Sequence, residues 1–199
     1  ILSQDPNLLD IFSTRKDLYL TVARAVFKNP TLKFSSKEDP LRRRAKAVTL
    51  GTNYGLQPEG LAEREEMLLE EAQTLINNYL SWLSGLSSWM RRTQTEAAKN
   101  EYVKTPGGRT VHINPYMKNW ANVAINSPIQ GGGADILKRA MIRIYEKTGR
   151  KNYPIIIPVH DEIIAECSKK VATGTKNLIV ECMVKAFADI VGDRILGEV

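Results

Sequence analysis

The pattern of apolar residues changes near residue 100, and this change constrains the fold more than any other feature of the sequence. Before it, apolar residues recur with the three-four periodicity of helices, for example Leu75, Tyr79, Trp82, Leu86 and Trp89. After it, "EYVKT" and "RTVHI" are two short β-rich runs around Pro-Gly-Gly, which is typical of a hairpin. The sequence therefore predicts an α+β protein with a boundary near residue 100.

The first hundred residues carry helix signals. "DLYLTVARAVF" (17–27) has a helical apolar period, and "EDPLRRRAKAVTL" opens with Asp39 and Pro40, which are favoured at helix starts. Gly55 can end that second helix. From Pro58 to about Lys99 we expect one long helix or two stacked helices.

The second half is mixed. We expect a helix from about Asn119 to Glu146, interrupted at Pro128, where "NSPIQGGGAD" places polar side chains beside glycines. "YPIIIPVHDEIIAEC" is apolar, then charged, then apolar again, which indicates two buried strands with a charged tip.

Composition narrows the class of protein. A chain of 199 residues with 43% hydrophobic content is long enough to bury a core. Its net charge of +6 and pI near 9.3 favour an anionic partner such as nucleic acid or nucleotides. Cys167 and Cys182 lie far from any CxxC spacing, so we expect neither a disulfide framework nor a zinc site. No apolar run reaches the roughly 18 residues needed to span a membrane.

The segment "RRRAKAVTLGTNYG" (42–55) concentrates cations before two glycines. At about 100° per residue, one narrow arc of a helix holds Arg42, Lys46, Thr49 and Asn53. Leu50 lies at the edge of this arc and Tyr54 further round. One interpretation is a solvated basic face. The other is a clamp in which Arg42 and Lys46 hold a triphosphate while its base and sugar lie toward Leu50 and Tyr54.

A second cluster is "VHDEII" (159–164), in which Asp161 and Glu162 adjoin apolar flanks. Paired carboxylates there are costly unless a cation or hydrogen bonds compensate them, and Mg²⁺ prefers such hard oxygen ligands. The alternative is a polar hairpin turn that faces water. His160 and His112 lack the spacing of a metal-binding pair.

Four segments, in order, resemble motifs of the DNA polymerase I family, the family A DNA polymerases. "RRRAKAVTLGTNYG" is similar to motif B, "YVKTPGGR" to the Gly-Tyr-Val-x-Thr-x-x-Gly-Arg hairpin, "NSPIQGGGAD" to Asn-x-Pro-x-Gln-Gly-x-x-Ala-Asp, and "VHDE" to motif C. The resemblance implies an incomplete polymerase right-hand fold. A mostly helical fingers subdomain would occupy 1–100, and a partial palm with antiparallel strands and helices would occupy 101–199.

The resemblance also implies roles for individual residues. The implied nucleotide-binding residues are Tyr19, Arg42, Lys46, Leu50 and Tyr54. Tyr19 stands where many relatives have a histidine, and its hydroxyl could donate a hydrogen bond but brings no charge. The residues implied to contact primer-template DNA are Arg109, Asn126, Gln130 and His160. Asp161 is the implied metal ligand and catalytic carboxylate, with Glu162 supporting it, in a two-metal Mg²⁺ site.

Several features depart from the family pattern. Leu50 replaces an aromatic residue of motif B, Pro158 a common glutamine, and Asn122 a frequent arginine. Motif A, similar to Asp-Tyr-Ser-Gln-Ile-Glu, would come immediately before "ILSQDP" and would supply the other metal-binding aspartate. We therefore expect this chain alone to be inactive and to need the upstream polymerase segment as a partner.

The function that these motifs imply is template-directed nucleotidyl transfer from deoxynucleoside triphosphates to a primer 3′ end, in replication or repair and in the cytoplasm of a bacterial or phage-infected cell. Two alternatives remain open. One is an inert nucleic-acid-binding subunit of a split polymerase, or a gene remnant. The other is a single-subunit RNA polymerase, whose motif C resembles His-Asp-Ser, so that Glu162 speaks against it.

Overall fold

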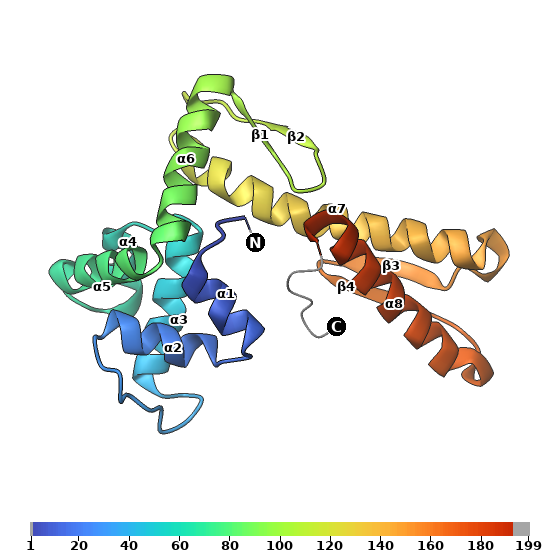
Figure 1. Ribbon diagram of the computed structural model, residues 1–199, viewed down its shortest axis with the longest axis horizontal. Coiled ribbons are helices and arrows are strands. Elements are labelled where there is room, and N and C mark those ends of the chain that lie inside the picture. Colours follow the sequence, from blue (N-terminus) through green and yellow to red (C-terminus); the bar gives the residue numbers. More distant parts are fainter. Residues whose placement is uncertain (1, 193–199) are drawn as a thin grey trace. The chain divides into compact units, whose positions relative to one another are not determined.

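The computed structural model describes residues 2–192 and divides the chain into two compact units (Figure 1). Unit 1 comprises the chain up to Glu101 together with Ile113–Asn126, and unit 2 comprises Tyr102–His112 and the chain from Ser127 onward. The fold is mostly helical with two small antiparallel sheets, which confirms the predicted α+β class. No helix in the described part of the chain has the length and apolar character needed to cross a membrane.

Unit 1 is built from helices. They are α1 (Pro6–Ser13), α2 (Leu18–Val26), α3 (Pro40–Asn53), α4 (Pro58–Glu65), α5 (Leu69–Trp82) and α6 (Ser84–Asn100). The predicted start of α3 is confirmed, because Asp39 caps it by accepting a hydrogen bond from the Leu41 amide at 2.9 Å, and Pro40 follows directly. Gly55, with φ of 81°, follows the end of α3 as expected.

The region from Pro58 to Lys99 forms three helices, so the prediction of one or two was wrong. Glu66 adopts a left-handed conformation with φ of 50° and ends α4. Leu83, with φ −97° and ψ 62°, separates α5 from α6. Each of these helices buries an apolar face, so the apolar periodicity continues across both breaks. The periodicity therefore does not reveal where the helices end.

The core of unit 1 lies among α2, α3 and α5. Val22, Val48 and Tyr79 are fully buried in it. The Tyr79 hydroxyl donates a hydrogen bond to Asn53 Oδ1 at 2.9 Å, which satisfies the polar end of this large side chain. Burial raises the pKa of Tyr79 far above its ordinary value, so the hydroxyl stays a donor at any physiological pH.

A buried carboxylate joins the beginnings of two helices in unit 1. Asp5 Oδ1 accepts hydrogen bonds from the amides of Asn7 and Leu8 in α1, at 3.0 and 3.3 Å. Its Oδ2 accepts from the amides of Gly85 and Leu86 at the start of α6, at 2.8 and 3.1 Å. One side chain thus satisfies four amide donors that helix starts leave open.

The first element of unit 2 is the predicted hairpin. Strands β1 (Tyr102–Lys104) and β2 (Thr110–His112) pair antiparallel, with Val103 opposite Val111. The hairpin prediction is confirmed, since Pro-Gly-Gly lies in the connecting turn.

Helix α7 (Trp120–Thr148) is continuous, so the predicted interruption at Pro128 was wrong. Proline removes one backbone hydrogen bond and disfavours a helix interior, which motivated the prediction. Burial outweighs this local cost: Ala124 and Ile125 are fully buried before Pro128, and Ala140 and Ile144 are fully buried after it. Residues up to Asn126 belong to unit 1 and the remainder of α7 to unit 2.

Beyond α7, unit 2 contains a second hairpin and a terminal helix. These elements are η1 (Arg150–Asn152), β3 (Ile155–Val159), β4 (Glu162–Ala165), η2 (Lys169–Val171) and α8 (Ala172–Val191). Strands β3 and β4 pair antiparallel as expected, but the prediction that they are buried was wrong, because Ile156 is 61% exposed and Ile157 49%. Within residues 2–192 the two strands form a sheet by themselves, so no third strand covers them.

Candidate functional site

Two of the arginines in α3 are neutralised by carboxylates. Arg43 Nε lies 3.4 Å from buried Glu65, and Arg44 Nη1 donates to Glu71 at 2.9 Å. Because their charge is compensated within the protein, these two cations support the structure of unit 1.

Arg42 and Lys46 differ from their neighbours. Within residues 2–192 neither has a carboxylate partner. The guanidinium carbon of Arg42 lies over the Tyr19 ring, 5.1 Å from its centre, and Lys46 is exposed. The two residues are one helical turn apart, so α3 presents two uncompensated cations close together, as binding of an anion requires.

The expected polar arc of α3 divides further along the helix. Thr49 is buried, and Asn53 accepts the Tyr79 hydrogen bond, so both residues point into unit 1. Leu50 and Tyr54 instead are 39% and 48% exposed. Leu50 is therefore not a core leucine, and the outward face of α3 continues from the two cations to an apolar and an aromatic side chain.

A cavity of about 520 Å³ adjoins the end of α3. Its lining is Leu50, Gly51, Tyr54, Gly55, Leu56, Gln57, Gly60, Arg64 and Asn122. The two motif glycines are needed for close packing: a Cβ on Gly51 would lie 2.6 Å from Leu56 Cδ2, and one on Gly55 would overlap the Asn122 amide.

Two asparagines of α7 contact the backbone at the end of α3. Asn122 Nδ2 donates to the Gly55 carbonyl at 3.3 Å, and Asn126 Nδ2 lies 3.4 Å from the Tyr54 carbonyl. The Oδ1 of Asn126 is buried without a hydrogen-bond partner in the described part of the chain. Gln130, one turn further along α7, is exposed.

The structure ties Arg109 to α7 through a residue to which the sequence analysis gave no role. Asp135 Oδ1 accepts from Arg109 Nε at 2.9 Å, and its Oδ2 accepts from the Thr105 hydroxyl. Partial burial raises the pKa of Asp135, but the hydrogen bonds from Thr105 and Arg109 outweigh it and lower the pKa. Arg109 also donates to the Gly131 carbonyl at 3.1 Å. The sequence signal for this contact was an aspartate that closely follows three consecutive glycines, together with the arginine of the "YVKTPGGR" hairpin.

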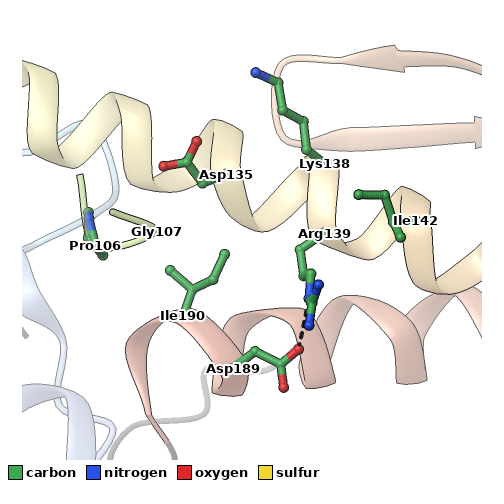
Figure 2. Close-up of a pocket in the computed structure, with 8 residues that line it drawn as sticks. All are labelled: Pro106, Gly107, Asp135, Lys138, Arg139, Ile142, Asp189 and Ile190. Atoms are coloured by element: carbon green, nitrogen blue, oxygen red, sulfur yellow. Dashed lines mark hydrogen bonds and ion pairs between the residues drawn. The ribbon is translucent and has the colours of Figure 1, made fainter. Parts of the chain in front are cut away.

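A second cavity, of about 390 Å³, lies in unit 2 (Figure 2). It is lined by Pro106, Gly107, Asp135, Lys138, Arg139, Ile142, Asp189 and Ile190. Arg139 Nε pairs with Asp189 at 3.3 Å, and Lys138 extends away from Asp189. Because its acidic and basic residues balance, this cavity lacks the charge excess that would attract phosphate.

The charged tip of the β3–β4 hairpin is a tight turn. His160 and Asp161 connect the strands, Glu162 begins β4, and all three are exposed. His160 has φ of 54°, a left-handed conformation that is uncommon for residues other than glycine. In the described residues no group of three or more His, Cys, Asp or Glu side chains could hold a metal ion, and His112 forms no such group with His160.

Comparison with known proteins identifies the family. The family model "DNA polymerase family A" matches residues 1–191. DNA polymerase I of Pseudomonas aeruginosa is 34% identical over 174 residues, covering 83% of this chain and 19% of that protein. The thermostable DNA polymerase I of Thermus thermophilus is 31% identical over 194 residues, covering 94% and 23%. The chain thus spans about a fifth of these relatives.

A solved structure agrees with the sequence matches. The POL domain of Pol1 from M. smegmatis, in complex with DNA primer-template and dNTP, superposes with a TM-score of 0.81 at 31% sequence identity. The match covers 93% of this chain and 34% of that one. Since the family model matches nearly the whole chain, the chain belongs to DNA polymerase family A.

Proposed function

We propose that this chain forms the fingers subdomain (1–100) and part of the palm (101–199) of a DNA-directed DNA polymerase of replication or repair. The observation that carries this proposal is a pair of cations, Arg42 and Lys46, that have no carboxylate partner within residues 2–192 and lie beside exposed Leu50 and Tyr54. The M. smegmatis relative binds primer-template DNA and a deoxynucleotide, which supports the same partners here. A cytoplasmic location belongs to the same proposal.

On the nucleotide side, α2 and α3 would bind the incoming triphosphate. Arg42 offers a planar fork of N–H donors to phosphate oxygens, and Lys46 offers a mobile charge one turn away. Leu50 would contact the sugar, and Tyr54 would stack near the base. Tyr19 completes this group of nucleotide-binding residues.

On the DNA side, we assign contacts with primer-template to Arg109, Asn126, Gln130 and His160. Among the described residues no group donates to the buried Oδ1 of Asn126, and this supports a role in accepting a hydrogen bond from a ligand. Arg109 is 44% exposed at its side chain although it binds Asp135, so part of its guanidinium can face a phosphate. The left-handed backbone of His160 is a locally unfavourable conformation of the kind that persists at functional sites.

The carboxylates of the β3–β4 turn fit Mg²⁺ in part. Asp161 and Glu162 supply exposed, hard oxygen donors, with Asp161 as the proposed metal ligand and Glu162 beside it. They can hold only one side of a two-metal site, because within residues 2–192 no larger cluster of ligands exists. The metal ions, when bound, would activate the primer 3′ hydroxyl and stabilise the departing pyrophosphate.

A segment carrying motif A is the remaining partner in this proposal. The open edges of the β3–β4 sheet support it, since within residues 2–192 no third strand pairs with them and a further strand could do so. A polypeptide of these 199 residues alone would then lack the second metal-binding aspartate and would extend no primer.

The test is primer extension by a joined polymerase, in which this chain follows an upstream segment, from a family A relative, that carries motif A. We expect labelled deoxynucleotide to be incorporated with Mg²⁺ and primed template, and no incorporation by the 199 residues alone. Asp161→Asn should abolish turnover while primer-template binding persists. If the joined polymerase folds and binds DNA but extends no primer, the proposal is contradicted.

A matched pair of variants tests the nucleotide assignment. Lys46→Ala should raise the KM for deoxynucleotides about tenfold or more, because a charge-assisted contact with phosphate is lost. Arg44→Ala removes a neighbouring cation that is already paired with Glu71, and it should leave this KM within about twofold. Equal effects of the two variants would refute the clamp.

A further inference from the structure

Arg42 has a partner of a different chemical kind from those of the adjacent arginines. Its guanidinium lies 5.1 Å from the centre of the Tyr19 ring, within the roughly 6 Å range of cation–π attraction. Arg43 and Arg44 pair with carboxylates. Only Arg42 of the three is therefore held by an uncharged group.

This difference matters for an arginine that must bind an anion. A carboxylate partner cancels the charge of a guanidinium and occupies its N–H donors. An aromatic ring attracts the face of the guanidinium and leaves the N–H donors at its edge available. The ring can therefore orient Arg42 without competing with phosphate.

The side chains of Tyr19 and Arg42 are both attached to well-anchored helix turns. Tyr19 lies in the first turn of α2, one turn before the fully buried Val22, and Asp17 caps this helix by accepting from the Leu20 amide at 2.9 Å. Arg42 lies in the first turn of α3, one turn before the fully buried Ala45. The geometry of the pair is thus fixed by two capped helices whose buried faces lie in the same core.

We infer that Tyr19 is a positioning residue for Arg42, and that its ring rather than its hydroxyl performs this role. The inference rests on the proposed function, in which Arg42 binds the triphosphate. It assigns to the aromatic ring of Tyr19 an action through Arg42 instead of a direct contact with phosphate.

A double-mutant cycle in the joined polymerase tests the inference. Tyr19→Leu should raise the KM for deoxynucleotides about two- to fivefold, as loss of one cation–π contact predicts, with kcat and primer-template binding nearly unchanged. Tyr19→Phe, which retains the ring face, should rescue this KM. In an Arg42→Ala background, Tyr19→Leu should cause no further change. Tyr116→Leu, at a fully solvated tyrosine of unit 1, is the matched control.

Two results would overturn the inference. If Tyr19→Phe were as impaired as Tyr19→Leu, the hydroxyl would be the active group. If Tyr19→Leu still raised the KM without Arg42, Tyr19 would act independently of it. Failure of the proposed function looks different: the unmodified joined polymerase would not extend primers, or Arg42→Ala itself would leave the nucleotide KM unchanged.

Discussion

Asp5 shows how one side chain can determine the stability of unit 1. Its carboxylate is 1% exposed and accepts four amide hydrogen bonds from two helix starts. We predict that Asp5→Ala lowers the free energy of unfolding of unit 1 by about 2–4 kcal/mol, because buried amides lose their acceptor. Denaturant titration followed by tryptophan fluorescence measures this change.

The control for Asp5 lies in α1, the helix that Asp5 caps. Asp10 is exposed and forms a surface ion pair with Lys16 at 2.6 Å, so Asp10→Ala should cost less than about 1 kcal/mol. Comparable losses for the two variants would mean that Asp5 contributes no more than a surface carboxylate.

Leu50 carries a prediction about substrate choice. It is exposed beside the cavity at the end of α3, and it has no hydroxyl to replace the hydrogen bond lost when a nucleotide lacks its 3′ hydroxyl. We predict that the joined polymerase rejects dideoxynucleotides and that Leu50→Tyr relaxes this rejection by about tenfold, the effect of one hydrogen bond. Competition between deoxy and dideoxy substrates measures the ratio. An unchanged ratio would place Leu50 outside the sugar pocket.

At the scale of elements, ion pairs between α7 and α8 make unit 2 sensitive to acid. Glu181 accepts from Lys185 at 2.6 Å and from Lys147 at 2.9 Å, and these hydrogen bonds lower its pKa from 4.5 to about 2. Because the folded-state pKa lies below the unfolded-state value, this stabilisation is complete above about pH 4.5 and is lost as the pH falls toward 2.

The resulting prediction is a decrease in the stability of unit 2 as the pH falls from about 4.5 toward 2. Glu181→Gln should reduce this slope, because the variant has no carboxylate to protonate. The remaining slope should come from Asp189, whose pKa is lowered by Arg143 and Arg139, and from Asp135, whose pKa is lowered by Thr105 and Arg109. Circular dichroism during denaturant titration at each pH measures how the stability of unit 2 depends on pH. An unchanged slope in the glutamine variant would show that the two lysines do not stabilise the folded carboxylate.

The elements that sequence predicted correctly depend on neighbouring residues. Asp39 and Pro40 start α3, and Pro-Gly-Gly turns the first hairpin, through contacts only a few residues apart. Asp5 and Gly85, by contrast, are 80 residues apart, and no local pattern reveals their contact. Pro128 was misjudged for the same reason, because burial along α7 outweighs its local cost.

The same contrast between local patterns and long-range contacts holds for the candidate site. Spacing on a helix singled out Arg42 and Lys46, and the resemblance to the family supplied the roles of the remaining site residues. Helix geometry alone also placed Thr49 and Asn53 on the same face as the two cations. In the structure Thr49 is buried and Asn53 accepts the hydrogen bond from Tyr79 of α5, so this arc is exposed only at the start of α3. The partners of the arginines, and the link from Asp135 to Arg109, depend on which helices meet, so periodicity could not supply them.

At the scale of the whole molecule, the two units differ greatly in their buried apolar surface. Large side chains such as Leu61, Tyr79 and Leu83 fill the core of unit 1. The buried apolar side chains among the described residues of unit 2 are Val103, Pro128, Ala140, Ile144, Pro154, Cys182 and Ala186. Since burial drives folding, unit 2 should be the less stable unit.

This asymmetry predicts two unfolding transitions. All three tryptophans, Trp82, Trp89 and Trp120, belong to unit 1, so their fluorescence reports on that unit, whereas circular dichroism reports on the helices of both. In guanidinium, the circular dichroism signal should begin to fall at a lower concentration than the fluorescence changes. Joining the upstream segment should raise the first transition and leave the second unchanged, because a further strand would pair with an open edge of the β3–β4 sheet. Coincident transitions of the 199-residue chain would mean that the two units fold as one.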